Sequence, residues 1–183
     1  MVWNLFLAAI PLALSFVLFR RARHLGVAWW VTFGAWLVFL PNAPYVLTDV
    51  VHMRGDLRAS PSHAYTLAVL LTYALYAAAG LISYVASLQL LRNFLHRVAP
   101  RRCVLPVLAA VHALSVIAMY LGRVVRLNSW DVVVAPRSVV SVLHMPHPHT
   151  VALLAGMFVV VGIGAYVVGA VGDKTIAVLR SNS

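Results

Sequence analysis

The chain alternates between long apolar stretches and short segments that hold almost all of its charged residues. A helix of about 20 apolar residues crosses the hydrocarbon layer of a membrane, which is about 30 Å thick. Five stretches have this character, at residues 2–19, 25–40, 63–91, 104–122 and 151–171, and the second is short. Each is apolar on every side, which favours helices over the alternating strands of a membrane β-barrel. The pattern predicts an all-α transmembrane bundle of about five spans, forming one integral membrane domain over residues 1–183.

Two segments beside these spans are rich in polar residues and prolines, and we expect interfacial or re-entrant pieces near 41–53 and 128–145. In the first, Pro41 and Pro44 disfavour regular helix. An interruption at membrane depth is tolerated only where it is buried in protein or lines a polar cavity, and Asn42 is available to satisfy freed backbone groups. If helix resumes after Pro44, three polar side chains share a face that points into the bundle: Tyr45, Asp49 and His52.

The second polar segment follows the fourth span directly. Arg123 and Arg126 lie three residues apart, on one face of a helix. Asn128 begins a turn or caps a helix, and Trp130 suits the membrane interface. Asp131 comes next. Basic, amide, aromatic and acidic side chains therefore gather within one short stretch.

Each polar segment has two interpretations. The first is either a helix end at the water boundary, with Asp49 and His52 solvated or capping, or a polar pocket that opens outward. In the second, the arginines either reach lipid headgroups while Trp130 anchors the chain, or one of them pairs with Asp49 or Asp131. Pairing is favoured because an isolated charge at the edge of hydrocarbon is costly. An arginine left over would bind phosphate or carboxylate.

Basic residues predict the orientation, because Lys and Arg are enriched in cytoplasmic loops. Nine fall in one set of loops: Arg20, Arg21, Arg23, Arg92, Arg97, Arg101, Arg102, Lys174 and Arg180. Five fall in the other set: Arg54, Arg58, Arg123, Arg126 and Arg137. We therefore expect the N-terminus outside and the C-terminus inside. With five spans, the two polar segments share a side in either orientation.

Composition agrees with a membrane protein. The chain is 63% hydrophobic and 10% charged, whereas a soluble domain is about half apolar and about a quarter charged. In a soluble protein the net charge of +10 would indicate nucleic acid. Here the charges lie between spans, where loop placement and anionic headgroups explain them. We expect the lipid bilayer as a partner and no nucleic acid.

Histidines outside the spans are the candidate metal ligands: His52, His144, His147 and His149. Imidazoles near carboxylates bind zinc, but the spacing here fits no established signature, so we assign no metal and no cofactor. His112 lies within the fourth span, where an ionisable residue is a functional candidate. We expect it to bond to a neighbour such as Ser115 or to a facing helix, and a haem held between two such histidines is the alternative.

Small residues recur within the third and fifth spans. Ala77 to Gly80 are consecutive, and Ala152 and Gly156 are four apart, as are Ala165 and Gly169. Small residues at such spacing let helix backbones approach closely. We expect all of them to be packing positions.

Three stretches carry a family resemblance: Trp3-Asn-Leu-Phe-Leu-Ala8, Phe39-Leu-Pro-Asn-Ala-Pro-Tyr45 with Thr48, Asp49 and His52, and Tyr120-Leu-Gly-Arg123 with Arg126 and Asn128-Ser-Trp-Asp131. Through them the chain resembles the bacterial membrane family catalogued as domain of unknown function 1361. The similarity spans most of the chain. It implies an integral protein of the bacterial cytoplasmic membrane, without an assigned activity and without catalytic residues to transfer.

Three functions fit these residues. The leading hypothesis is an outward polar cluster that binds an anionic lipid headgroup or envelope intermediate through Asn42, Tyr45, Arg123, Arg126, Asn128 and Trp130. The second is an enzyme for metal-assisted hydrolysis or transfer at the membrane surface, with Asp49, His52, Asp131 and His144 as candidates. The third is an accessory subunit, whose partner is another protein or a second copy of the chain.

Overall fold

The fold is helical throughout the described part of the chain. The computed structural model describes residues 2–20, 25–59, 61–123 and 151–166, which contain helices and turns but no strand. The elements in order are α1 (Val2–Ser15), the π-helix η1 (Phe16–Arg20), α2 (Val27–Phe39), α3 (Asn42–Tyr45), the 3-10 helix η2 (Val46–Asp49), α4 (Val50–Arg58), α5 (His63–Val98) and α6 (Arg101–Arg123). A further helix, Val151–Tyr166, follows. The predicted all-α class is confirmed.

Four helical runs among these residues are long and apolar enough to cross a membrane: Trp3–Arg20, Val27–Arg58, His63–Val98 and Arg101–Gly122. They match the first four predicted spans and agree with a multi-spanning membrane protein. The second run differs in length, because it does not stop at residue 40 but reaches Arg58. The fifth predicted span corresponds to the shorter helix Val151–Tyr166, and residues 167–171 lie outside the described part.

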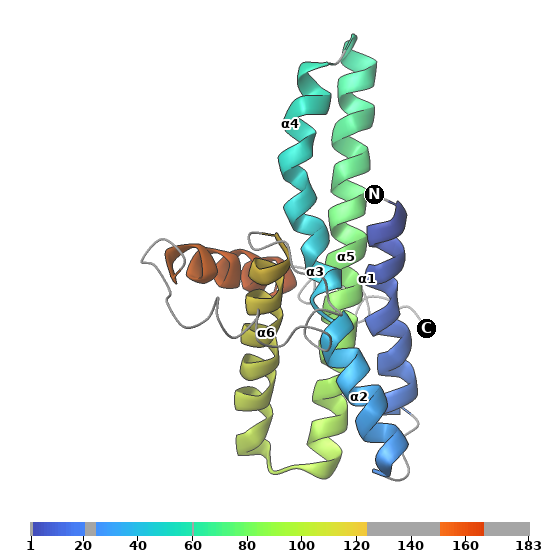
Figure 1. The fold of residues 1–183 in the computed structure, drawn as a ribbon, viewed down its shortest axis with the longest axis vertical. Coiled ribbons are helices and arrows are strands. Elements are labelled where there is room, and N and C mark those ends of the chain that lie inside the picture. The colour runs from blue at the N-terminus through green and yellow to red at the C-terminus, as the bar shows by residue number, and fades with distance from the viewer. Residues whose placement is uncertain (1, 21–24, 60, 124–150, 167–183) are drawn as a thin grey trace, which may run out of the picture.

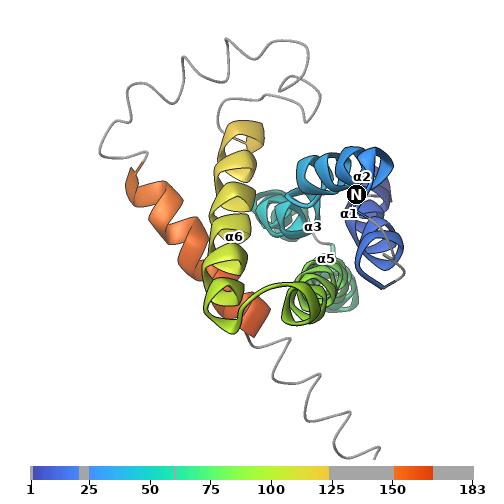
Figure 2. The same ribbon diagram turned by 90° about the horizontal axis from the view of Figure 1, so that it is seen from below.

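The long helix α5 is the axis of the bundle (Figure 1). α1 and α3 pack against it, and α6 returns beside it after a short turn (Figure 2). α4 runs along the first part of α5, and this hairpin extends beyond the N-terminus of α1 and the end of α6. Helix 151–166 lies across the bundle rather than along it (Figure 1). α3 also contacts α6.

Prolines shape the junction between α2 and α4. α2 ends at Phe39, and the amide of Ala43 donates to the carbonyl of Leu40 (3.2 Å) in a tightened turn. The side-chain amide of Asn42 donates to the Phe39 carbonyl (3.1 Å). This satisfies a backbone group at the end of the interrupted helix, as such an interruption in a membrane requires. η2 then carries the chain onward into α4 in the same general direction (Figure 1).

Gly80 allows α3 to reach the surface of α5. A Cβ on Gly80 would lie 2.5 Å from the carbonyl oxygen of Ala43 and 3.0 Å from the Cβ of Val46. The close packing predicted at Gly80 is therefore confirmed. Gly156 differs, because a Cβ there would meet no atom within 4 Å. Within the described residues, Gly156 therefore has no close helix contact, and the packing role predicted for it stays a prediction.

Aromatic rings close the opposite end of the bundle. The Phe19 ring packs edge-on against Trp36 (5.0 Å between centroids) and at a tilt against Phe94 (5.5 Å). The indole N–H of Trp36 donates to the hydroxyl of Ser15 (2.7 Å), which donates to the carbonyl of Pro11 (2.7 Å). Side chains of η1, α2 and α5 thus fix the first three spans to one another.

Candidate functional site

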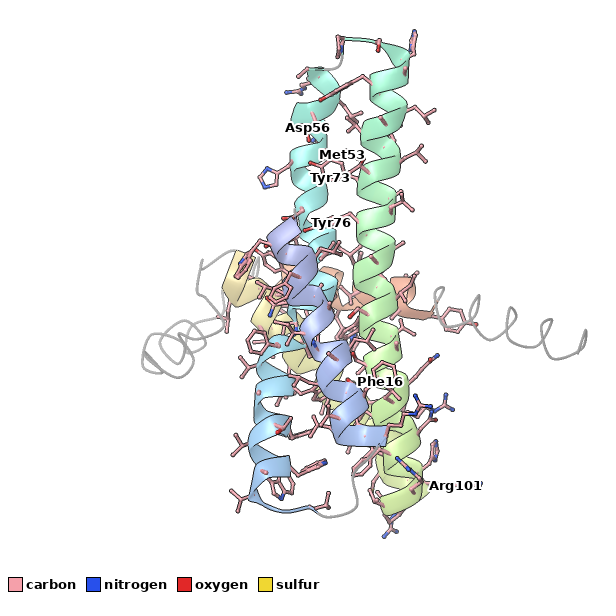
Figure 3. All side chains as sticks on the ribbon, turned by 90° about the vertical axis from the view of Figure 1, so that its right-hand side faces the viewer. Phe16, Met53, Asp56, Tyr73, Tyr76 and Arg101 are labelled. Atoms are coloured by element: carbon pink, nitrogen blue, oxygen red, sulfur yellow. The ribbon has the colours of Figure 1, made fainter. Side chains whose placement is uncertain are left out.

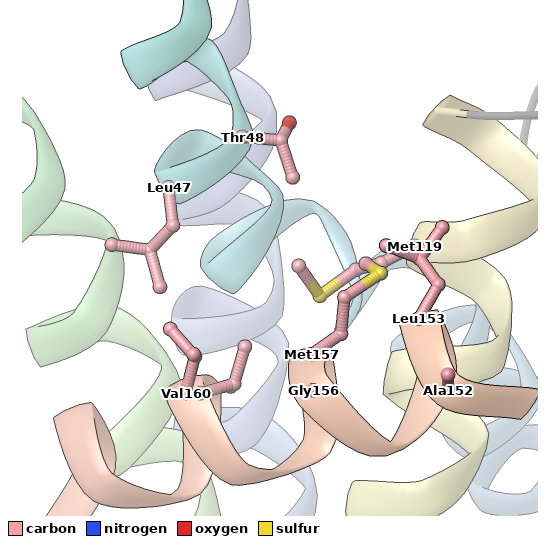
Figure 4. Close-up of a pocket in the computed structure, with 9 residues that line it drawn as sticks. Leu47, Thr48, Met119, Ala152, Leu153, Gly156, Met157 and Val160 are labelled. Carbon is pink, nitrogen blue, oxygen red and sulfur yellow. The ribbon is translucent and has the colours of Figure 1, made fainter. Parts of the chain in front are cut away.

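A cavity of about 340 Å³ lies where three separate parts of the chain meet. Figure 4 shows it between η2, the end of α6 and helix 151–166. The residues that line it are Leu47, Thr48, Met119, Ala152, Leu153, Gly156, Met157, Val160 and Val161. Ligand pockets in proteins commonly measure about 300–1,000 Å³. The cavity is therefore large enough for a small ligand or part of a hydrocarbon chain.

The walls of this cavity are apolar. Thr48 is the one lining residue with a hydroxyl, and that hydroxyl donates to the carbonyl of Tyr45 (2.6 Å). An apolar cavity offers water no hydrogen-bond partners and favours an apolar occupant. Leu153 and Val160 are 45% and 62% exposed, so the cavity can be reached from the outer surface of the bundle.

Local sequence explains the shape of the cavity. Met119 from α6 and Met157 from helix 151–166 reach into it (Figure 4), and flexible thioether side chains adapt to irregular surfaces. Gly156 adds room, because it has no side chain where a Cβ would meet empty space. The walls thus combine two flexible methionine side chains with a glycine, which has no side chain to fill the space.

Asp49, next in sequence to Thr48, is buried at the junction of three elements. It is 7% exposed, and its Oδ2 accepts hydrogen bonds from the side-chain amide of Asn4 (2.9 Å) and the hydroxyl of Tyr76 (2.8 Å). A buried carboxylate is costly unless hydrogen bonds or an opposite charge compensate for lost water. Asp49 therefore links η2 to α1 and α5. The interpretation of Asp49 as a solvated residue at a helix end does not fit this burial.

A second carboxylate joins α4 to α5. The hydroxyl of Tyr73 donates to Oδ2 of Asp56 (2.8 Å), and Figure 3 shows Asp56, Tyr73 and Tyr76 between the two helices. Tyr73 and Tyr76 lie three residues apart on one face of α5, and both are buried. The two tyrosines on one face of α5 thus donate to both carboxylates, Tyr76 to Asp49 of the first polar segment and Tyr73 to Asp56 of α4.

A third polar contact lies in the middle of α6. Nδ1 of His112 is 2.8 Å from the hydroxyl of Tyr84, and Nε2 is 3.2 Å from the carbonyl oxygen of Phe158. A carbonyl oxygen only accepts, so Nε2 carries the proton and Nδ1 accepts from Tyr84. The prediction that His112 bonds to a facing helix is confirmed twice, by α5 and by helix 151–166.

The predicted face of Tyr45, Asp49 and His52 is divided by the fold. Asp49 is buried, Tyr45 is half-buried and His52 is exposed. Arg123 is the last residue of α6, one turn after the lining residue Met119. The other candidates lie outside the described residues: Arg126, Asn128, Trp130, Asp131, His144, His147 and His149. The ligand-binding and catalytic roles of these residues, and of Asn42, stay predictions.

Potential metal ligands do not cluster in the described part. Among residues 2–20, 25–59, 61–123 and 151–166, no group of three or more His, Cys, Asp or Glu side chains is placed to hold a metal ion. The acidic residues there bond to tyrosine hydroxyls, and His112 bonds to a hydroxyl and a carbonyl. The described polar groups thus act by hydrogen bonding between helices.

Sequence reasoning missed the cavity. Its walls combine positions 47–48 of the predicted interfacial segment with position 119 and positions 152–161 of two predicted spans, and nothing in the sequence shows that these positions meet. The one available signal was the pair Ala152 and Gly156, small residues whose usual meaning is close helix packing. Whether a small residue marks a contact or a void depends on what faces it, and the sequence does not contain that information.

The chain matches one family model. The family is described as Protein of unknown function (DUF1361), and the match covers residues 3–163. That range includes every residue that lines the cavity and most of the four candidate spans. No curated protein and no solved structure matches the chain. The resemblance carried by the three sequence motifs is confirmed, and the chain belongs to the family Protein of unknown function (DUF1361).

Proposed function

We propose that the protein binds a membrane amphiphile, with one hydrocarbon chain in the cavity and an anionic head group beside the end of α6. The observation that carries this proposal is the apolar cavity of about 340 Å³, which is reached across exposed residues of helix 151–166. A methylene group occupies roughly the volume of a water molecule, about 30 Å³, so about ten chain carbons fit. The cavity therefore suits part of one chain and not two whole acyl chains.

The head group would lie beside Arg123. α6 ends at Arg123, one turn after Met119 of the cavity wall, and Arg126 follows three residues later in the sequence. A guanidinium group binds phosphate or carboxylate through two parallel hydrogen bonds. An apolar site followed by arginines fits lipids with an anionic head group, a class that includes phospholipids and lipid-linked envelope intermediates.

Binding of two matched lipids tests this proposal. Purified protein in detergent is titrated with dimyristoyl phosphatidylglycerol or with dimyristoyl phosphatidylcholine, and bound lipid is counted by native mass spectrometry. The chains are identical, and only phosphatidylglycerol carries a net negative charge. We expect the protein to retain phosphatidylglycerol preferentially. Equal retention of both lipids would contradict the role of the arginines.

Two pairs of variants separate the chain site from the head-group site. Gly156→Leu adds a large side chain to the cavity wall, at a position where a Cβ meets no atom within 4 Å, and should abolish retention. Gly34→Leu, at an equally open glycine in α2, should not. Arg123→Ala should remove the preference for the anionic lipid. Arg102→Ala, at the opposite end of α6, is its control. Retention by Gly156→Leu equal to that of the wild type would exclude the cavity as the chain site.

We further propose that the N-terminus faces outward from a bacterial cytoplasmic membrane. The loop charges support this orientation, and so does the placement of α4 at the end of the bundle opposite Arg101. With Cys103→Ser as background, Arg58→Cys should react with an impermeant maleimide in intact cells, whereas Arg101→Cys should react only after lysis. The opposite result would invert the orientation.

A further inference from the structure

We propose that Tyr84 and His112 form a polar support that positions helix 151–166 and thereby sets which chain lengths the cavity accepts. This inference rests on the lipid-binding function proposed above. Neither residue lines the cavity, so both act through the helix that does. They are positioning residues.

His112 of α6 contacts helix 151–166 directly. Its Nε2 lies 3.2 Å from the Phe158 carbonyl oxygen, and its ring meets the Phe158 ring edge-on, with 4.4 Å between centroids. Gly162, one turn later, also faces the imidazole, since a Cβ there would be in ordinary contact with Nε2 at 3.5 Å. The imidazole thus fits between two consecutive turns of helix 151–166.

Tyr84 holds the imidazole of His112 from α5. Tyr84 is fully buried, and its hydroxyl lies 2.8 Å from Nδ1. A neutral imidazole has one N–H and one lone pair. Because the Phe158 carbonyl only accepts, the N–H is at Nε2, and Nδ1 accepts from the Tyr84 hydroxyl. Both ring nitrogens are therefore engaged, one by α5 and one by helix 151–166.

The helix held in this way is also a wall of the cavity. Met157 and Val161 line the cavity, and they are the sequence neighbours of Phe158 and Gly162, the residues in contact with His112. His112 and Met119 are seven residues apart on α6, two turns along the same face. A shift of helix 151–166 on the imidazole would therefore change its separation from Met119 and from η2.

The second half of helix 151–166 also contacts α5. A Cβ on Gly164 would lie 3.2 Å from Leu81, so the two helices are in close contact at that point. With contacts at Leu81 and at His112, this half of the helix is held between α5 and α6. Close-packed interiors transmit such constraints, because they contain few voids that would absorb a shift.

A chain-length series tests the inference. Wild-type protein is titrated with phosphatidylglycerols from didecanoyl to distearoyl, and retention of each is measured by native mass spectrometry. We expect one preferred length. His112→Leu removes both polar contacts and should reduce the preference for that length by about threefold, the factor that corresponds to a typical hydrogen bond between membrane helices. Tyr84→Phe should act in the same direction.

A conservative variant and a spectroscopic readout distinguish positioning from a general loss of structure. His112→Gln offers one donor and one acceptor and should restore the wild-type preference. The ¹⁵N resonances of His112 should show a single tautomer with the proton at Nε2 in the wild type. If His112→Leu fails to fold, His112→Gln and Tyr84→Phe still carry the test.

Two results would overturn the inference while leaving lipid binding intact. One is an unchanged chain-length preference in both His112→Leu and Tyr84→Phe, with retention still abolished by Gly156→Leu. The other is a wild-type His112 with its proton at Nδ1, because Nε2 could then not donate to the Phe158 carbonyl. Failure of the proposed function gives a different pattern, in which the wild type retains no phosphatidylglycerol at any chain length.

Discussion

Replacing Gly80 by alanine should destabilise the bundle, although alanine is the better helix former. Gly80 lies in the middle of α5, where the chain of α3 crosses it. The added Cβ would lie 2.5 Å from the carbonyl oxygen of Ala43, whereas ordinary contact begins at 3.4 Å. The obstacle is backbone, which cannot rotate away as the end of a side chain can. α3 and α5 would therefore have to separate by about 0.9 Å at this point.

Two opposing terms set the size of this effect. Gly→Ala in a helix interior gains about 1 kcal/mol of intrinsic propensity. Overpacking a tight interface costs about 1–3 kcal/mol. We expect a net loss of about 1 kcal/mol in the free energy of unfolding for Gly80→Ala. Gly34→Ala and Gly156→Ala meet no atom within 4 Å, so they should gain up to about 1 kcal/mol. The change in the free energy of unfolding caused by Gly→Ala should therefore differ by about 2 kcal/mol between Gly80 and the two open glycines.

Equilibrium unfolding in mixed micelles of increasing SDS content measures these differences, with tryptophan fluorescence as the signal. All variants are compared at one detergent concentration. The Gly34→Ala and Gly156→Ala variants then measure how much alanine stabilises a helix when no neighbouring atom is in the way. Gly80→Ala should also weaken lipid retention, because Val46, which must move, adjoins Leu47 of the cavity wall. A Gly80→Ala protein as stable as Gly34→Ala would refute the close approach of α3 to α5.

Three hydrogen bonds give further predictions, two measured by the same unfolding assay and one by hydrogen exchange. Tyr76→Phe removes a donor to the carboxylate of Asp49 and should cost about 1.5 kcal/mol, with a smaller loss when Asp49→Asn is already present. Ser15→Ala leaves the buried indole N–H of Trp36 without its acceptor and should cost about 1–3 kcal/mol. An unchanged free energy of unfolding would contradict this and would mean that water replaces the hydroxyl as acceptor. Tyr73→Phe should accelerate hydrogen exchange in α4 while exchange in α6 stays unchanged, and equal effects in both helices would contradict a local role.

The spans were predictable because the hydrocarbon layer imposes one structure on an apolar run of sufficient length. Backbone groups without water must bond within the segment, so a run such as 104–122 has no alternative to helix. The interruption at Pro41 was predictable for the same reason, as was the use of Asn42 to satisfy the backbone. A bond from His112 to a facing helix was predictable from the high cost of an unsatisfied polar group within a span, although Tyr84 and Phe158 were not identified as its partners.

The end of the second span was not predictable from hydropathy. Polar residues begin near Asp49, and the apolar pattern indicates a boundary near residue 40. Helical hydrogen bonding continues past that boundary, because α4 finds a packing partner in the first part of α5. The end of an apolar run marks the edge of the hydrocarbon layer. The end of a helix depends instead on the tertiary contacts that its next turns can make.

The partners of Asp49 were not predictable because they depend on how helices are placed side by side. Asn4 lies 45 positions and Tyr76 27 positions from Asp49 in the sequence. Nothing local selects these two side chains among the other polar residues. The stripe of Tyr73, Tyr76 and Gly80 on α5 becomes meaningful only once α3 and α4 are known to face it.

The lengths of α5 and α6 locate the cavity with respect to the bilayer. α6, with 23 residues, is about 35 Å long, close to the hydrocarbon thickness of about 30 Å. α5, with 36 residues, is about 54 Å long. The two helices are joined by a short turn before Arg101, so their ends are level there and the excess of α5 lies at its start, beside α4.

We expect the hydrocarbon layer to cover at least the part of α5 from Tyr76 to Arg97, which is about 32 Å long. Arg97 bonds to the end of η1, and the exposed side chains of Leu67, Leu70, Leu71 and Leu75 continue the apolar surface of α5 beyond Tyr76. Because the end of α6 and helix 151–166 lie beside this part of α5 (Figure 1), we expect the cavity to open within the hydrocarbon layer and its occupant to enter sideways from the lipid. Such an entry would favour an amphiphile over a free anion as the ligand.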